Sequence, residues 1–226
     1  MNYKKKIPIL SRILNNLSQK IIIRNFNFYQ NSGNKYKGSR KETDTRVKVI
    51  KKKLISDNIK NLIDLGSAEG RFLKLASSLG IFAMGVEADE RRYLVSNYNK
   101  NFEDYKNFGV IFNEISLKFL KNVPQVDSII YLSIHHHILA STGIKIGNEI
   151  LKELFKKVKK SLFFETAMND EFSDKWPLNY RKNLKNMNDA SIKKFFKLLG
   201  AKKIQILANT KAYNKGYIRP LYYIKK

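Results

Sequence analysis

The sequence predicts an α/β protein: a doubly wound, mostly parallel seven-stranded sheet with helices on both faces and a C-terminal antiparallel hairpin edge. Two observations predict this fold. Five short apolar runs alternate with segments of helical period up to residue 166, and such alternation requires crossover connections between parallel strands. The last two runs, 202–208 and 217–223, are joined by a short polar loop without a helix, so they pair antiparallel.

The five parallel strands are short and mostly apolar. They cover residues 61–65, 81–87, 108–112, 126–134 and 161–166. Segments with apolar residues at intervals of three or four lie between them and are expected to be helices. These helices centre on residues 72–79, 89–98, 117–120 and 146–158. One more helix, over 191–199, ends at Gly200, a residue typical of helix C-caps.

The first 44 residues are expected to form a basic helical and loop extension, and residues 45–226 the α/β domain. Residues 1–30 place apolar side chains at helical spacing between Lys, Arg, Asn and Gln, which favours an amphipathic helix. Such a helix either contacts an anionic membrane surface or a partner, or packs on the domain as a lid.

The segment that leads into the first strand is expected to be a helix whose apolar face holds Val47, Ile50, Leu54 and Ile55. The charged residues ahead of this face are Arg40, Asp44 and Arg46. They either reach a site at the strand ends or form a solvated helix start capped by Thr43 or Asp44.

The chain is strongly basic, with 44 Lys and Arg against 19 Asp and Glu and a net charge of +25. This charge indicates either a polyanionic partner, such as RNA or an anionic membrane surface, or the Lys- and Asn-rich composition that an A/T-rich genome produces. There is no cysteine, which excludes thiolate chemistry and fits a reducing, cytoplasmic setting. No apolar run reaches about 18 residues, so no transmembrane segment is expected, and no secretory signal is recognised.

Polar residues follow each parallel strand, at the edge where such sheets bind ligands. Asp64 and Gly66 follow the first strand, and Glu87 ends the second. The remaining strand-end residues are Glu114, Ser133, His135, Glu165 and Thr166. An acid at the end of the second strand can accept hydrogen bonds from both hydroxyls of a ribose.

The turn after the first strand reads Asp64–Leu–Gly–Ser–Ala–Glu–Gly70. It lacks the three glycines of the dinucleotide fingerprint, and the chain contains no phosphate-binding G-x-x-x-x-G-K-[ST] motif. An aspartate at the head of the turn would repel a pyrophosphate. It would suit a cationic, amine-bearing ligand instead.

Residues 64–70 closely resemble the D-x-G-x-x-x-G loop of class I, Rossmann-like S-adenosylmethionine-dependent methyltransferases. Residues 85–89 resemble the second motif of that family, 113–115 the third and 127–133 the fourth, and the final hairpin resembles its extra sheet edge. The resemblance covers roughly residues 45–226. It implies the fold, the cofactor S-adenosyl-L-methionine and methyltransferase activity.

The resemblance also implies cofactor-binding roles for individual residues. Asp64 would lie near the amino group of the cofactor, Glu87 would hold the ribose hydroxyls, and Glu114 or Asn113 would face the adenine amino group. The loop residues Gly66, Ser67, Ala68 and Gly70 would approach the methionine part, and Ser133 belongs to the fourth motif. Ala68 stands where a glycine is often found.

All three histidines are consecutive, His135, His136 and His137, just after the fourth strand. In an extended segment, His135 and His137 would share a side and His136 would face away. His135 and His136 are the candidate catalytic residues, since an imidazole can take a proton from an accepting hydroxyl. Alternatively, these histidines pack on the cofactor or cap the next helix. No H-x-x-x-H motif or acid cluster accompanies them, so no metal site is expected.

The expected acceptor is a small molecule, a glycan or a lipid-linked compound. Enzymes of this family that methylate base amines usually carry an Asn/Asp-Pro-Pro-aromatic turn after the fourth strand, and this chain has Ser133–Ile–His–His136 there. RNA methylated at a ribose or ring atom stays an alternative, as does a non-catalytic binding module. Trp176, Pro177, Tyr180 and Arg181 either form part of the acceptor wall or, for Trp176, anchor the segment to the core.

Overall fold

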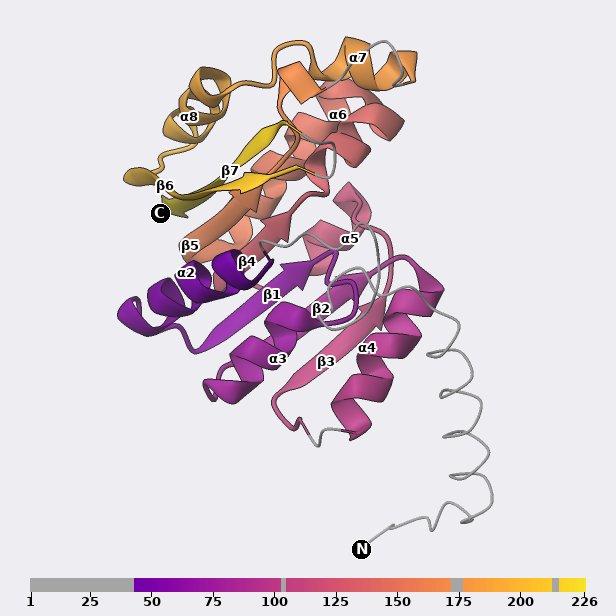
Figure 1. Cartoon of the computed structure of the whole chain (residues 1–226), viewed down its shortest axis with the longest axis vertical. Coiled ribbons are helices and arrows are strands. Elements are labelled where there is room, and N and C mark those ends of the chain that lie inside the picture. Colours follow the sequence, from indigo (N-terminus) through magenta and orange to yellow (C-terminus); the bar gives the residue numbers. More distant parts are fainter. Residues whose placement is uncertain (1–42, 103–104, 172–176, 213–215) are drawn as a thin grey trace, which may run out of the picture.

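The computed structural model describes residues 43–102, 105–171, 177–212 and 216–226. Its sheet has seven strands in the order β3-β2-β1-β4-β5-β7-β6 (Figure 1). Neighbours among β1 to β5 run parallel, while β7 pairs antiparallel with both β5 and β6. The predicted fold class, including the terminal hairpin, is confirmed.

The strands are β1 (Asn61–Leu65), β2 (Phe82–Glu87), β3 (Phe108–Phe112), β4 (Val126–Leu132), β5 (Val158–Glu165), β6 (Lys203–Lys211) and β7 (Ile218–Lys225). The helices are α2 (Thr43–Ser56), α3 (Arg71–Ser78), α4 (Glu90–Phe102), α5 (Leu117–Asn122), α6 (His135–Lys157), α7 (Leu178–Leu184) and α8 (Asp189–Leu198). A short 3-10 helix covers Asn169–Glu171.

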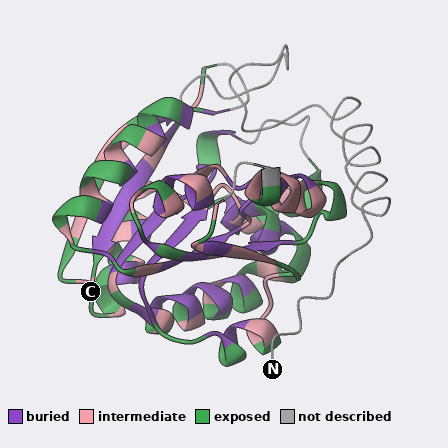
Figure 2. Cartoon of the chain, turned by 90° about the horizontal axis from the view of Figure 1, so that it is seen from below, coloured by how far each residue is buried: buried purple, intermediate pink, exposed green. Residues whose placement is uncertain are grey.

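Alternate side chains of the strands pack into two apolar cores, one on each face of the sheet. One core packs β-strand side chains such as Ile129 and Phe164 against α5, α6 and α8, with Phe155 and Phe196 at its centre. The other packs Ile130 and its neighbours against α2 and α3. Figure 2 shows the buried strands between helices whose outer surfaces are exposed. The carboxyl ends of β1, β2, β4 and β5 are therefore held at one edge of a rigid sheet.

The segment after β4 differs from the prediction. The strand ends at Leu132, Ser133 adopts a left-handed backbone with φ 61°, and α6 begins at His135. The three histidines are thus helical, so the facing expected for an extended segment does not apply, and the strand predicted to residue 134 ends two residues earlier. The helix predicted from residue 146 starts eleven positions earlier, and Gly143 at φ 82° and ψ 166° interrupts it.

The apolar face predicted for the first helix is also corrected. The buried residues of α2 are Thr43, Arg46, Ile50 and Leu54, while Ile55 is 59 % exposed. Arg46 therefore points toward the sheet rather than to solvent. Helix α2 crosses the expected boundary between residues 44 and 45. That boundary stays a prediction, because the helix expected within residues 1–30 lies outside the described residues. Trp176 also lies outside them, so its predicted role is not tested.

Over the described ranges, none of the helices combines the length and the apolar character that a membrane crossing requires.

Candidate functional site

The loop between β1 and α3 turns back sharply under the end of β2. Gly66 and Gly70 have φ of 75° and 82°, and Ala68 between them has φ 48°, so the loop depends on left-handed conformations that glycine tolerates best. A Cβ on Gly66 would lie 2.5 Å from Cδ1 of Ile134. The first glycine is therefore required both by the backbone and by the close approach of the segment after β4.

The carboxylate of Glu87 binds this loop. Its Oε2 accepts a hydrogen bond from the backbone N–H of Ala68 at 2.7 Å. Its Oε1 accepts from the N–H groups of Ala88 at 3.1 Å and Asp89 at 2.9 Å. These bonds compensate a buried negative charge and hold it at the end of β2. The sequence predicts that Glu87 binds a ligand, and in the structure its carboxylate binds the backbone of the loop between β1 and α3.

Asp64 lies opposite Gly85 in the β1–β2 pair, two residues before Glu87, and its situation is different. The residue is 3 % exposed, and its Oδ2 has no hydrogen-bond partner among the described residues. Burial, with a smaller contribution from the negative charge of Glu87, raises the pKa of Asp64 to about 8. A cationic group brought to this position would find an uncompensated carboxyl that it can ionise.

The end of β5 carries a third buried carboxylate, Glu165, and this one is fully paired. Arg46 Nε of α2 lies 2.7 Å from Glu165 Oε2. The hydroxyl of Ser133 donates to Oε1 at 2.5 Å, and Thr210 Oγ1 of β6 lies 3.0 Å from Oε2. The ion pair and its hydroxyl partners join α2, the end of β4 and the terminal hairpin around the end of β5.

A pocket of about 200 Å³ opens at this edge of the sheet. Its floor is the glycine loop and the end of β4, and its walls come from α2, α3, α4 and the start of α6. The lining residues are Thr43, Arg46, Gly66, Ala68, Phe72, Arg92, Leu132, Ser133, Ile134 and His137. We refer to it as the strand-end pocket.

Three of the predicted cofactor-binding residues, Gly66, Ala68 and Ser133, line this pocket. Asp64 and Glu87 are buried behind the loop.

The other predicted cofactor-binding residues lie elsewhere. The side chain of Ser67 is fully buried and packs toward Gly85 of β2, where an added Cβ would lie 2.7 Å from its hydroxyl. Gly70 is the residue before α3, and Glu114 is exposed two positions beyond β3.

The three histidines point to three different environments. His137 lines the strand-end pocket, and its Nδ1 lies 2.9 Å from the hydroxyl of Tyr180 on α7. His136 is buried, and its Nδ1 accepts a hydrogen bond from the N–H of Ala167 at 3.3 Å. His135 is fully buried on another side of the helix, facing a different cavity.

The sequence left Arg46 between a strand-end site and a solvated helix start, and the structure places it in the lining of the strand-end pocket; His137 was not among the candidate catalytic residues. The burial of Arg46 could have been predicted, because it occupies a position on the apolar stripe of α2 where a charged side chain needs a buried partner. Within the described ranges, no cluster of three or more His, Asp or Glu side chains could hold a metal ion.

No protein-family model and no curated protein sequence matches this chain. Solved structures do match. WbdD, described as a bifunctional kinase-methyltransferase, superposes with a TM-score of 0.73 at 17 % identity, over 91 % of this chain and 45 % of WbdD. The chain thus spans less than half of that neighbour.

A second solved structure matches along its whole length. The N-terminal domain of EvdMO1, solved in the presence of SAH and D-fucose, superposes with a TM-score of 0.65 at 14 % identity, over 96 % of both chains. At these identities the similarity establishes a shared fold. The chain is an α/β domain of the same architecture as a protein bound to SAH.

Proposed function

We propose that the chain is a methyltransferase that binds S-adenosyl-L-methionine against the glycine loop. The observation that carries the proposal is Asp64, a buried carboxyl directly before that loop whose Oδ2 has no hydrogen-bond partner among the described residues. A cofactor with an amino group would supply the missing cation. The SAH-bound neighbour of the same fold supports this choice of ligand.

The residues at the edge of the sheet fit such a cofactor. Gly66 and Ala68 present backbone rather than bulky side chains to the strand-end pocket. The carboxylate of Glu87 is in place to exchange its bond to the Ala68 N–H for bonds from ribose hydroxyls. When bound, S-adenosylmethionine supplies an electrophilic methyl group on a sulfonium. The work of the protein is to position donor and acceptor.

For the acceptor we propose a neutral, hydroxyl-bearing compound of sugar type, supported by the neighbour solved with D-fucose. His137 and Tyr180 offer an imidazole and a phenol at the pocket wall. An imidazole so placed can take the proton that a hydroxyl releases when it is methylated. For this role the geometry favours His137 over the predicted His135 and His136, because of the three only His137 lines the pocket.

The first experiment is isothermal titration calorimetry with S-adenosylhomocysteine. Binding is expected for the unmutated protein, and Glu87→Ala should weaken it strongly. Glu114→Ala, which removes an exposed acid just beyond β3, tests the predicted adenine contact in the same series. An unmutated protein that is folded and shows no heat of binding would contradict the donor assignment and favour a non-catalytic binding module.

The second experiment identifies the acceptor by transfer of tritium-labelled methyl groups into a fractionated cell extract. Label in a glycan or small-molecule fraction supports the proposal, and His137→Phe should lower the rate without changing the affinity for S-adenosylhomocysteine. RNA is the alternative that the net charge of +25 favours. Label that enters RNA, and is lost on ribonuclease treatment, would replace the sugar-type acceptor by RNA.

A further inference from the structure

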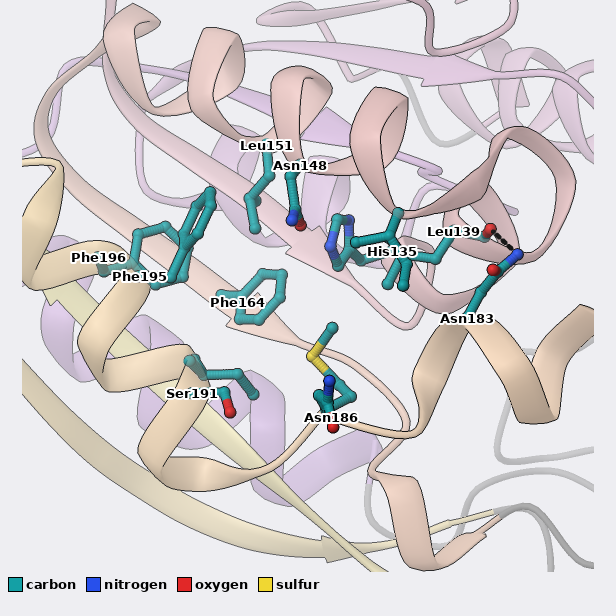
Figure 3. A pocket seen from close by; sticks show the side chains of 13 residues that line it. His135, Leu139, Asn148, Leu151, Phe164, Asn183, Asn186, Ser191, Phe195 and Phe196 are labelled. Carbon is teal, nitrogen blue, oxygen red and sulfur yellow. Dashed lines mark hydrogen bonds between the residues drawn. The ribbon is translucent and has the colours of Figure 1, made fainter.

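A second cavity, of about 240 Å³, lies on the face of the sheet covered by α6, α7 and α8 (Figure 3). It shares no lining residue with the strand-end pocket. The lining residues are His135, Leu139, Ile144, Asn148, Leu151, Phe164, Asn183, Asn186, Met187, Ser191, Ile192, Phe195 and Phe196. We call it the helical cavity.

The break in α6 shapes one wall of the helical cavity. Gly143 leaves the helical conformation between Leu139 and Ile144, and both of these residues line the cavity. Asn183 of α7 donates a hydrogen bond to the carbonyl oxygen of Leu139 at 2.9 Å, the dashed line in Figure 3. This hydrogen bond joins α7 to α6 just before the break, and residues of α8 complete the lining.

His135 is the polar group that makes this cavity unusual. The side chain is fully buried, and neither ring nitrogen has a hydrogen-bond partner among the described residues. Its ring makes edge contacts with Tyr131 and Phe164, at centroid distances of 6.0 and 5.7 Å. Burial lowers the pKa of His135 to about 3, so the imidazole is neutral and offers one donor and one acceptor. A buried polar group left without partners is costly, and a ligand would remove that cost.

The lining also excludes whole classes of ligand. Among the described residues that line the cavity there is no Lys, Arg, Asp or Glu, although the chain contains 44 Lys and Arg and 19 Asp and Glu. Phosphates, carboxylates and ammonium groups would find no counter-charge there. Phenyl rings and aliphatic side chains supply much of the lining, and the amides of Asn148 and Asn186 with the hydroxyl of Ser191 add uncharged polar groups.

We propose that the helical cavity binds an uncharged ring compound that carries a hydroxyl group, with His135 as its buried hydrogen-bond partner. The volume suits one substituted six-membered ring, since a cavity of about 150 Å³ already accepts benzene. The three phenylalanines contact the ring face or edge. The proposal does not depend on methyl transfer, because its residues are not those of the strand-end pocket.

The test uses the full-length protein, labelled with ¹⁵N in its histidines, and three probes of one ring size: phenol, toluene and benzoate. The chain has three histidines, so the ring signals can be assigned by single substitutions. Phenol should shift the His135 ring signals saturably with Kd of about 1 mM. Toluene should bind about three- to tenfold more weakly, since it lacks the hydroxyl. Benzoate should leave the signals in place.

Two variants separate a ligand site from a packing defect. His135→Phe keeps a ring of similar shape and removes both nitrogens, so it should raise Tm and abolish the preference for phenol over toluene. Asn148→Phe fills the cavity with a ring and should abolish binding of both. Lys145→Phe, which adds the same ring at an exposed position of α6, is the matched control and should bind phenol normally.

Several results would overturn the proposal. Equal affinities for phenol and toluene would show that His135 makes no bond to the ligand. Retained phenol binding in Asn148→Phe would place the binding elsewhere, and the absence of saturation by phenol up to about 10 mM would show that the cavity holds no such ring. If His135→Phe fails to fold, the comparison of Asn148→Phe with Lys145→Phe decides.

Discussion

The uncompensated carboxyl of Asp64 predicts that the affinity for S-adenosylhomocysteine rises with pH. Its pKa is raised to about 8, so the group is mostly protonated at neutral pH. A bound ammonium group favours the ionised form. Binding must therefore release the proton of Asp64, and the affinity below pH 8 follows the small fraction of protein in which Asp64 is already ionised.

The size of the effect follows from the pKa. With a pKa of about 8, the ionised fraction of Asp64 is about 1 % at pH 6 and about 9 % at pH 7. The affinity should therefore increase about tenfold between pH 6 and pH 7, a range in which the amino group of the ligand stays protonated. Calorimetry in two buffers of different ionisation enthalpy should detect the release of nearly one proton per complex.

Substitution isolates the contribution of this carboxyl. Asp64→Asn should bind more weakly, show little dependence on pH between 6 and 7, and release no proton. The exposed Asp170→Asn is the matched control and should retain the slope of the unmutated protein. An affinity of the unmutated protein that stays constant from pH 6 to 7 would refute the assignment of Asp64 to the amino group.

Three further predictions concern stability and are checked by chemical denaturation. Because the pKa of Asp64 is raised above its unfolded value of 3.8, the free energy of unfolding of the ligand-free protein should fall as pH rises from about 4 to 8, and Asp64→Asn should lack this fall. Gly70→Ala should cost about 1–2 kcal/mol, since φ is 82° and the new Cβ would lie 2.5 Å from the Ser96 hydroxyl; an unchanged midpoint would contradict this. Arg46→Met should cost about 3–5 kcal/mol, because it leaves the buried charge of Glu165 without the guanidinium that neutralises it. Adding Glu165→Gln should restore part of the loss, and equal stability of the single and double variants would show that the pair is not coupled.

The fold could be predicted because its signals are local. Each strand is a short apolar run bounded by turn residues, and the absence of a helix between the last two runs fixes their antiparallel pairing. The head of the loop was also predictable: Asp64, Gly66 and Gly70 lie within seven residues, and the two glycines have the positive φ that a sharp turn requires.

The partner of Arg46 could not be predicted, because the pairing with Glu165 joins elements that are far apart in the chain. The sequence indicates that Arg46 is buried, but it does not indicate its partner. Arg46 shares the spacing of Ile50 and Leu54, which indicates burial, but nothing local names the acid that it meets. The choice among strand-end acids depends on the order of strands in the sheet.

The orientation of the histidines could not be predicted, for a different reason. The run from Ile134 to Leu139 suits a strand end as well as a helix start. The left-handed residue that separates them is Ser133, a residue type that gives no warning of positive φ. Once α6 begins at His135, successive side chains point in different directions around the helix axis. His137 then faces the strand-end pocket and His135 the helical cavity.

Glu165, Glu87 and Asp64, three of the buried acids at this edge of the sheet, differ in how their charge is compensated, and the proposed ligand depends on this local difference rather than on the net charge. Glu165 is compensated by a cation, and Glu87 by backbone N–H groups. In the part of the chain that the structure describes, the Oδ2 of Asp64 has no hydrogen-bond partner, although the chain as a whole carries a net charge of +25. A polyanion is attracted to the outside of such a protein, but it cannot satisfy a buried acid. The unsatisfied position is complementary to an amino group, so the donor assignment stands on Asp64 whatever acceptor the rest of the surface attracts.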